Sequence, residues 1–101
     1  MKLKEDVILQ GLRPEMLIAV IVSNDVYAKY GEELVITSVV DSKHSATSLH
    51  YSGCAIDLRT RFFEFDEVSL VAADIRGRLT EDFDVIVESD HIHIEYQPIY
   101  K

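Results

Sequence analysis

Cysteine is nearly absent from this chain, because Cys54 is the only one among 101 residues. A single cysteine excludes a disulfide within the chain, so the chain need not fold in an oxidising compartment. The first residues are charged and lack the long apolar core of a signal peptide. We therefore expect synthesis and folding in a cytosol.

Basic side chains are also scarce, with 10 lysine and arginine residues against 18 acidic ones and a formal net charge of −8. Binding to a nucleic-acid backbone needs lysine and arginine to displace counterions, so this class of partner is not expected. The same charge disfavours attachment to an anionic membrane surface. No membrane span is expected either, because the apolar run at residues 16–22 is far shorter than the roughly 20 residues required.

Apolar residues are abundant enough for a core, at 48 % of a chain whose length suits one domain over residues 1–101. Pro14 occupies a first-turn position and Gly31 an end position, which predicts a helix over residues 14–30. Because that segment is apolar nearly all round, we expect it to be mostly buried. Apolar residues at helical spacing predict a second helix, which Asp66 could cap and which Gly77 weakens near its end.

Four short segments are predicted to be strands: 34–40, 54–58, 84–87 and 91–96. The first is rich in β-branched residues, and the second is entered through Gly53. Ser89 and Asp90 suit a tight turn between the last two, which predicts a hairpin. The fold class is therefore α+β. We expect an antiparallel sheet of about four strands, with both helices on one face and a cleft on the other.

All four histidines lie in two short windows, His44 with His50 and His91 with His93. Strand alternation places His91, His93 and Glu95 on one face of residues 91–96. Two windows brought together by a sheet could supply the imidazole and carboxylate ligands that zinc takes. From spacing alone the alternatives stay open, because an H-x-H on a strand is often a solvent-facing pair and an aspartate such as Asp57 is more often a turn or capping residue.

Residues 48–57, Ser-Leu-His-Tyr-Ser-Gly-Cys-Ala-Ile-Asp, resemble the S-x-H-x-x-G-x-A-x-D signature of the zinc D,D-carboxypeptidase family. That family includes D-Ala-D-Ala dipeptidases and phage L-alanyl-D-glutamate endolysins. The resemblance implies zinc as the cofactor and His50 and Asp57 as two of its ligands. The segment Asp90-His91-Ile92-His93 is similar to the late D/E-x-x-H segment of the family, which makes His93 the third ligand, and Glu95 matches its H-x-E ending.

The same windows also resemble the N-terminal signalling domain of Hedgehog proteins, which shares this fold and zinc site. His44 stands six residues before the first ligand, as in that domain, and the H-I-H of residues 91–93 follows a glutamate. The spacing from Glu88 to this H-I-H is one residue shorter than in Hedgehog. The two resemblances together span residues 35–98.

Roles for further residues follow from these resemblances. The general base is Asp90 by the peptidase pattern and Glu88 by the Hedgehog-like one, and we favour Glu88. His44 would donate a hydrogen bond to the developing oxyanion. His91 would line the cleft or support a ligand, and Ser48 would orient the substrate loop.

One departure concerns the arginine that many of these peptidases carry after the first strand to bind substrate. Here residues 39–43 contain no arginine, and Lys43 is a weaker substitute. Arg59 and Arg61 are the alternative basic residues, with surface charge as their other interpretation.

The resemblance thus implies a zinc metallopeptidase whose substrate is a peptidoglycan stem peptide, of the D-Ala-D-Ala carboxypeptidase or L-Ala-D-Glu endopeptidase type. It also implies a phage or prophage setting, with action at the host cell wall. The alternative is a non-catalytic, Hedgehog-like module that keeps zinc for stability or partner binding. The missing arginine and the acidic surface favour this alternative.

Overall fold

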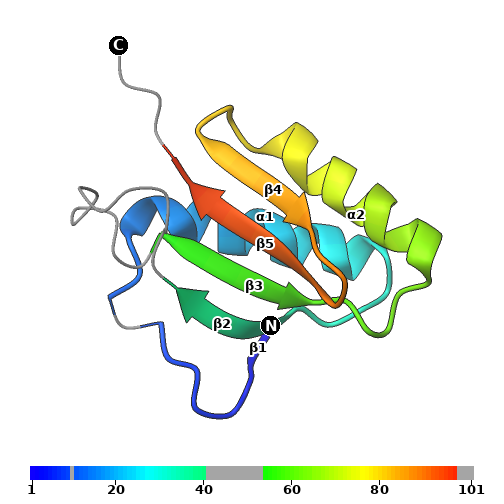
Figure 1. Ribbon diagram of the computed structural model, residues 1–101, viewed down its shortest axis with the longest axis horizontal. Coiled ribbons are helices and arrows are strands. Elements are labelled where there is room, and N and C mark those ends of the chain that lie inside the picture. Colours follow the sequence, from blue (N-terminus) through cyan, green and yellow to red (C-terminus); the bar gives the residue numbers. More distant parts are fainter. Residues whose placement is uncertain (10, 41–53, 98–101) are drawn as a thin grey trace.

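The structure is a computed structural model, and it describes residues 1–9, 11–40 and 54–97 (Figure 1). The elements in chain order are β1 (Lys2–Leu3), α1 (Pro14–Lys29), β2 (Val35–Val40), β3 (Ala55–Arg59), α2 (Phe65–Arg78), β4 (Phe83–Val87) and β5 (His91–Tyr96). The predicted α+β class is confirmed. Neither described helix is long and apolar enough to cross a membrane.

The sheet has five strands in the order β1-β2-β3-β5-β4. Strand β1 pairs in parallel with β2, and all other pairs are antiparallel. The predicted hairpin is confirmed as β4 and β5, where the amide of Glu88 donates to the carbonyl of His91 at 2.8 Å. The sequence predicted about four strands because the two residues of β1 are too few to show an alternating pattern.

Helix α1 begins at Pro14, as predicted, and is followed by Gly31 with a φ of +80°, a conformation that glycine adopts without strain. The expectation that this helix is mostly buried is wrong on one side. Leu17, Ile18 and Ile21 are 48 %, 54 % and 62 % exposed. The side of the helix opposite these three residues packs against the sheet and α2. Apolar residues all round the helix therefore did not mean that every side is buried.

Helix α2 begins one residue before Asp66, the predicted capping residue. Glu64 is the N-cap instead, and it forms a capping box with Glu67, while Asp66 lies in the first turn. Both positions place negative charge at the helix N-terminus, where the helix dipole favours it. Gly77 lies within the helix, which ends at Arg78.

The core lies between the helices and one face of the sheet, and α1 passes behind the sheet in Figure 1. Alternation along the two central strands sends Ile56, Leu58, Ile92 and Ile94 into this core, all fully buried. The intervening side chains therefore lie on the opposite face of the sheet, which carries the polar residues of β3 and β5.

Replacing Ile94 by alanine is expected to lower the free energy of unfolding by about 2–5 kcal/mol, because the removed atoms leave a cavity in a closely packed core. Ile86 offers a matched control in the same hairpin, since it is 40 % exposed. The Ile86→Ala change should cost less than about 1 kcal/mol. Urea unfolding of both variants measures the difference, and equal losses would contradict the assignment of the core face.

An ion-pair network joins the two helices. Lys29 donates from Nζ to Asp74 Oδ2 at 2.8 Å, and Arg78 donates from Nε to Asp74 Oδ1 at 3.0 Å. The hydrogen bond from Lys29, together with that from Arg78, holds the pKa of Asp74 below its ordinary value of 3.8, although burial opposes the shift.

A lowered folded-state pKa means that Asp74 stabilises the fold above the unfolded-state pKa, and that this contribution is lost as the pH falls through the folded-state value. Asp74→Asn should therefore destabilise the protein at neutral pH and make little difference at about pH 2. Thermal unfolding at both pH values provides the measurement. Asp25→Asn, at an exposed position of α1, should show no such pH-dependent difference.

Candidate metal centre

The pairing of β3 with β5 brings polar side chains from distant parts of the chain together. Asp57 lies opposite His93, and Arg59 lies opposite His91. The neighbours of these residues along each strand point into the core, so all four side chains start from the other face of the sheet. These residues are brought together by the register of β3 with β5, although the two strands are far apart in the sequence.

His93 is held between two carboxylates. Its Nδ1 lies 2.7 Å from Asp57 Oδ1, and its Nε2 lies 3.2 Å from Glu95 Oε1. Burial lowers the pKa of His93, but the hydrogen bonds to Asp57 and Glu95 and their negative charges outweigh it, so the pKa is raised above 6.5. A metal ion on this ring would take the place of a proton, since only the neutral imidazole is a ligand.

His91 shows a different arrangement. Its Nδ1 lies 2.6 Å from Asp90 Oδ1, and its Nε2 lies 3.6 Å from Asp57 Oδ1. The contact with His91 lowers the pKa of Asp90. A carboxylate on one ring nitrogen fixes the tautomer and leaves the other nitrogen to face the group, which is how metal-bound histidines are commonly oriented.

Glu95 is the most buried acidic group of the site, since its side chain is 4 % exposed. Its second oxygen accepts a hydrogen bond from Gln97 Nε2 at 2.6 Å. A buried carboxylate needs such partners to offset its lost hydration. The sequence placed Glu95 on the histidine face, but it gave no sign that this residue would be buried against His93.

Asp57, His91 and His93 together form a group that could hold a metal ion, with one donor atom from each lying within 4.8 Å of the others. Two imidazoles and a carboxylate are a donor set typical of zinc. Ligands of a tetrahedral zinc lie roughly 3.3–3.6 Å apart, given bond lengths of 2.0–2.2 Å. The 3.6 Å between His91 and Asp57 fits this spacing.

The 2.7 Å between His93 and Asp57 is instead the length of a hydrogen bond. These two side chains would have to separate by less than about 1 Å to share an ion. The donor set therefore fits zinc, with a small adjustment at one pair.

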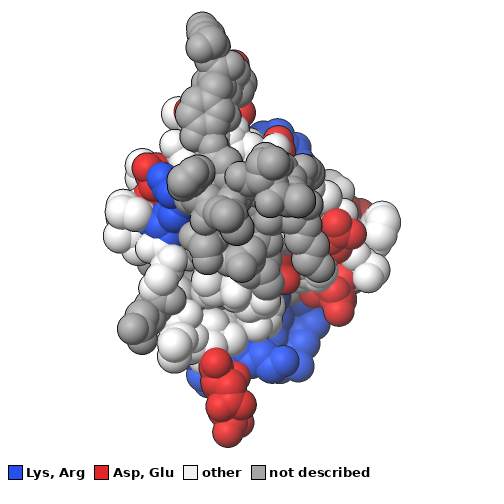
Figure 2. Space-filling model, turned by 60° about the vertical axis from the view of Figure 1, so that its left-hand side comes forward, with Lys and Arg blue, Asp and Glu red and all other residues white. Residues whose placement is uncertain are grey.

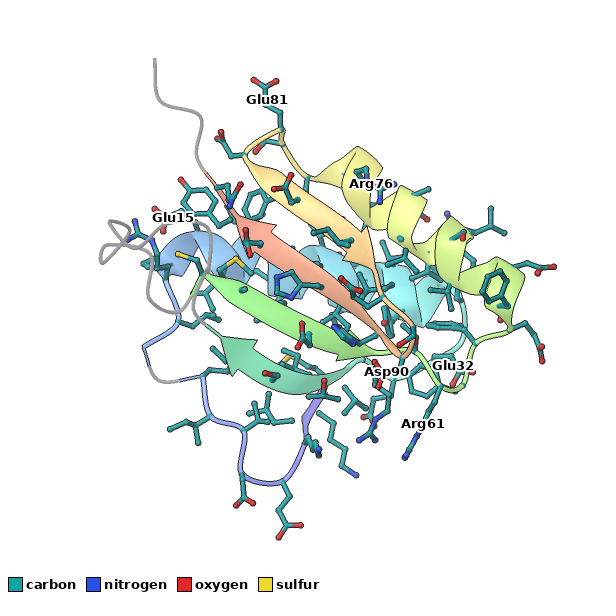
Figure 3. The ribbon with its side chains drawn as sticks, viewed as in Figure 1. Glu15, Glu32, Arg61, Arg76, Glu81 and Asp90 are labelled. Carbon is teal, nitrogen blue, oxygen red and sulfur yellow. The ribbon has the colours of Figure 1, made fainter. Side chains whose placement is uncertain are left out.

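Among the predicted site residues, the structure brings Asp57 and His93 together as expected, and adds His91 to them as a possible ligand rather than a neighbour. Asp90 contacts His91, and it lies at the turn between β4 and β5 (Figure 3). Glu88 lies in the same turn with an exposed side chain. The remaining predicted residues lie outside the described part of the chain: Lys43, His44, Ser48 and His50.

Comparison with known proteins found no match: no protein-family model matches the sequence, and no curated protein or solved structure matches it.

Proposed function

We propose that this protein is a zinc-dependent metallopeptidase that cleaves peptidoglycan stem peptides. The observation that carries the proposal is the convergence of Asp57, His91 and His93 on the sheet face opposite the helices. The signature at residues 48–57 supports it, because Asp57 is a ligand by that signature and a member of the group by geometry.

The signature and the geometry agree on two ligands and differ on the third. Both include Asp57 and His93. The signature adds His50, whereas the described residues add His91. A catalytic zinc site has three protein ligands and keeps one position open, so an enzyme would use one of these two histidines and leave the other beside the site.

The chemistry of this proposal is peptide hydrolysis without a covalent intermediate. When bound, zinc would act as a Lewis acid on the scissile carbonyl and lower the pKa of water. Glu88 or Asp90 would accept the proton of the attacking water and pass it to the leaving amine. His44 would donate a hydrogen bond to the oxygen on which negative charge develops.

Metal analysis followed by a cleavage assay tests this function. The purified protein should bind one zinc ion and cleave muropeptides, and it should lose activity in His50→Ala and in the double variant Glu88→Gln/Asp90→Asn. The variants need a check of folding by circular dichroism. A fully zinc-loaded protein without turnover on muropeptides of varied composition would count against a peptidase.

The second candidate is a non-catalytic module that keeps zinc for stability or partner recognition. The membership of His91 in the described group supports it: if His50 is also a ligand, as the signature implies, the site would have four protein ligands. A site with four protein ligands is closed and structural. In that case zinc removal should lower the melting temperature. His91→Ala should weaken zinc binding, and neither the unchanged protein nor this variant should cleave peptides.

A further inference from the structure

The outer edge of β2 is paired with β1 over only part of its length. Strand β1 has two residues, and the amide of Lys4, directly after it, donates to the carbonyl of Ile36 at 2.9 Å. The chain then turns away, because the amide of Val7 donates to the carbonyl of Lys4 at 2.9 Å and closes a tight turn. Figure 1 shows the segment after β1 bending away from β2. Residues 37–40 of β2 therefore lie beyond the end of β1.

This turn holds Asp6 in an unusual backbone conformation. The φ of Asp6 is +72°, and among the described residues no other residue except glycine has a positive φ. Aspartate and asparagine adopt this conformation at a lower cost than most residues do. The turn thus ends β1 after Leu3 at some energetic cost, instead of letting the chain continue along β2.

The main-chain groups of Val39 face this uncovered edge. Ile36 pairs with Leu58 on β3, and the carbonyl of Ile36 faces β1. Val39 pairs with Ile56, two residues away on β3, because a register shift adds one residue to β2 in between. Hydrogen-bonding direction alternates from residue to residue, so the amide and carbonyl of Val39 face the same side as the carbonyl of Ile36. No backbone hydrogen bond joins them to residues 5–9, so they can pair with another strand.

A hollow of about 270 Å³ lies at this edge, between β2 and the segment that has turned away. It is lined by Asp6, Val7, Ile8, Thr37, Ser38 and Val39. Ile8 is 63 % exposed and offers an apolar contact, and none of the ion pairs among the described residues involves Asp6. Figure 2 shows acidic side chains projecting at the lower end of the molecule, where this segment lies. The hollow thus combines unpaired main-chain groups, an apolar side chain and a carboxylate.

We propose that the edge of β2 at residues 37–39 binds a partner peptide as an added strand, and that this peptide carries a lysine or arginine beside β-branched apolar residues. The peptide pairs with the main chain of Val39, as partners of exposed sheet edges commonly do. Its cationic side chain reaches Asp6, and an apolar one contacts Ile8. A second copy of this chain fits less well, because residues 37–39 hold no cation for Asp6 and each copy carries a net charge of −8.

This binding edge is separate from the candidate metal centre. Ser38 lies opposite Asp57, so a strand added to the far side of β2 lies two strand spacings from β3, or about 10 Å. It therefore leaves Asp57, His91 and His93 uncovered. Binding at the edge depends neither on zinc nor on turnover.

Titration with the peptide acetyl-Thr-Val-Lys-Val-Thr-amide, followed by NMR of the backbone amides of the protein, tests this edge. Amide signals of residues 37–39 and 6–8 should shift, and to the same extent with and without zinc. The same peptide with all its backbone amides N-methylated should bind about tenfold more weakly, because it can no longer donate to Val39 and its methyl groups keep the strands apart. This control changes only the peptide, so it does not depend on the folding of a variant.

The charge preference is tested with a peptide in which glutamate replaces the lysine, which should bind about fivefold more weakly. Asp6→Asn should remove this preference and keep the turn, because asparagine also tolerates a positive φ. Glu5→Gln is the matched control and should keep the preference, since Glu5 is exposed next to Asp6 but does not line the hollow.

The outcomes distinguish this edge from other binding surfaces. Equal binding of the N-methylated peptide, shifts confined to residues 91–93, or no binding at millimolar peptide would each overturn the proposal. A concentration-dependent dimer that shifts the amides of residues 37–39 without peptide would show a second copy as the occupant and would also overturn it. Shifts at residues 37–39 that require the amides of the peptide and the carboxylate of Asp6 would support it, whether or not the protein hydrolyses peptides.

Discussion

Asp57→Asn should reduce zinc affinity by more than about 100-fold, which exceeds the loss typical for a residue that only supports a ligand. Asp57 is the only carboxylate among the three donors of the group, and its Oδ1 faces both His91 and His93. An amide in its place is a weaker ligand and removes the negative charge that offsets the charge of the ion. Competition with a chromophoric chelator measures the affinity, and the proposed peptidase activity should disappear with the bound zinc.

A second aspartate provides the control for this change. Asp66 is exposed in the first turn of α2, outside the metal group, so Asp66→Asn makes the same chemical change elsewhere. It should leave zinc binding unaltered. If Asp57→Asn bound zinc as tightly as the unchanged protein, the group formed by Asp57, His91 and His93 would not be the metal site.

The sequence predicted an element well where its apolar residues recur at a clear strand or helix spacing, and poorly where they do not. Residues 91–96 alternate strictly, so the sequence assigned Ile92 and Ile94 to the core face and His91 and His93 to the other, as the structure has them. Helix α1 has no apolar stripe to distinguish, so the sequence could not show that Leu17 and Ile21 would remain exposed. Strand β1 is fixed by pairing with β2 and not by its own residues.

The candidate site was predictable in its members but not in its geometry. Asp57 and His93 were identified from a resemblance, and their approach depends on the register of β3 with β5, which local sequence does not specify. The same register sets His91 near Asp57 and Arg59 opposite His91. A hollow beside this group is lined by residues from separate segments, among them Lys4, Thr37 and Arg59, so it forms only once the sheet is assembled.

Glu88→Gln and Asp90→Ala should have separable effects, because the two acids relate differently to the metal group. Asp90 contacts Nδ1 of His91 and so orients the nitrogen that faces Asp57. Its loss should weaken zinc binding about 10–100-fold. Glu88 has an exposed side chain in the same turn, and its amide donates a hydrogen bond to the backbone carbonyl of His91. As general base it should leave zinc affinity intact, while Glu88→Gln lowers kcat by about 10²–10⁴.

These expectations are checked by measuring kcat at saturating zinc alongside zinc affinity. Glu81→Gln makes the same change on an exposed glutamate before the other end of β4 and should alter neither quantity (Figure 3). If Asp90→Asn abolished kcat at full zinc loading while Glu88→Gln kept it, the base would be Asp90. An unchanged kcat in both would mean that neither acid handles the proton. Because Asp90 contacts the His91 ring whereas Glu88 bonds to His91 through the backbone, affinity and turnover together distinguish a residue that positions the metal site from one that performs chemistry in it.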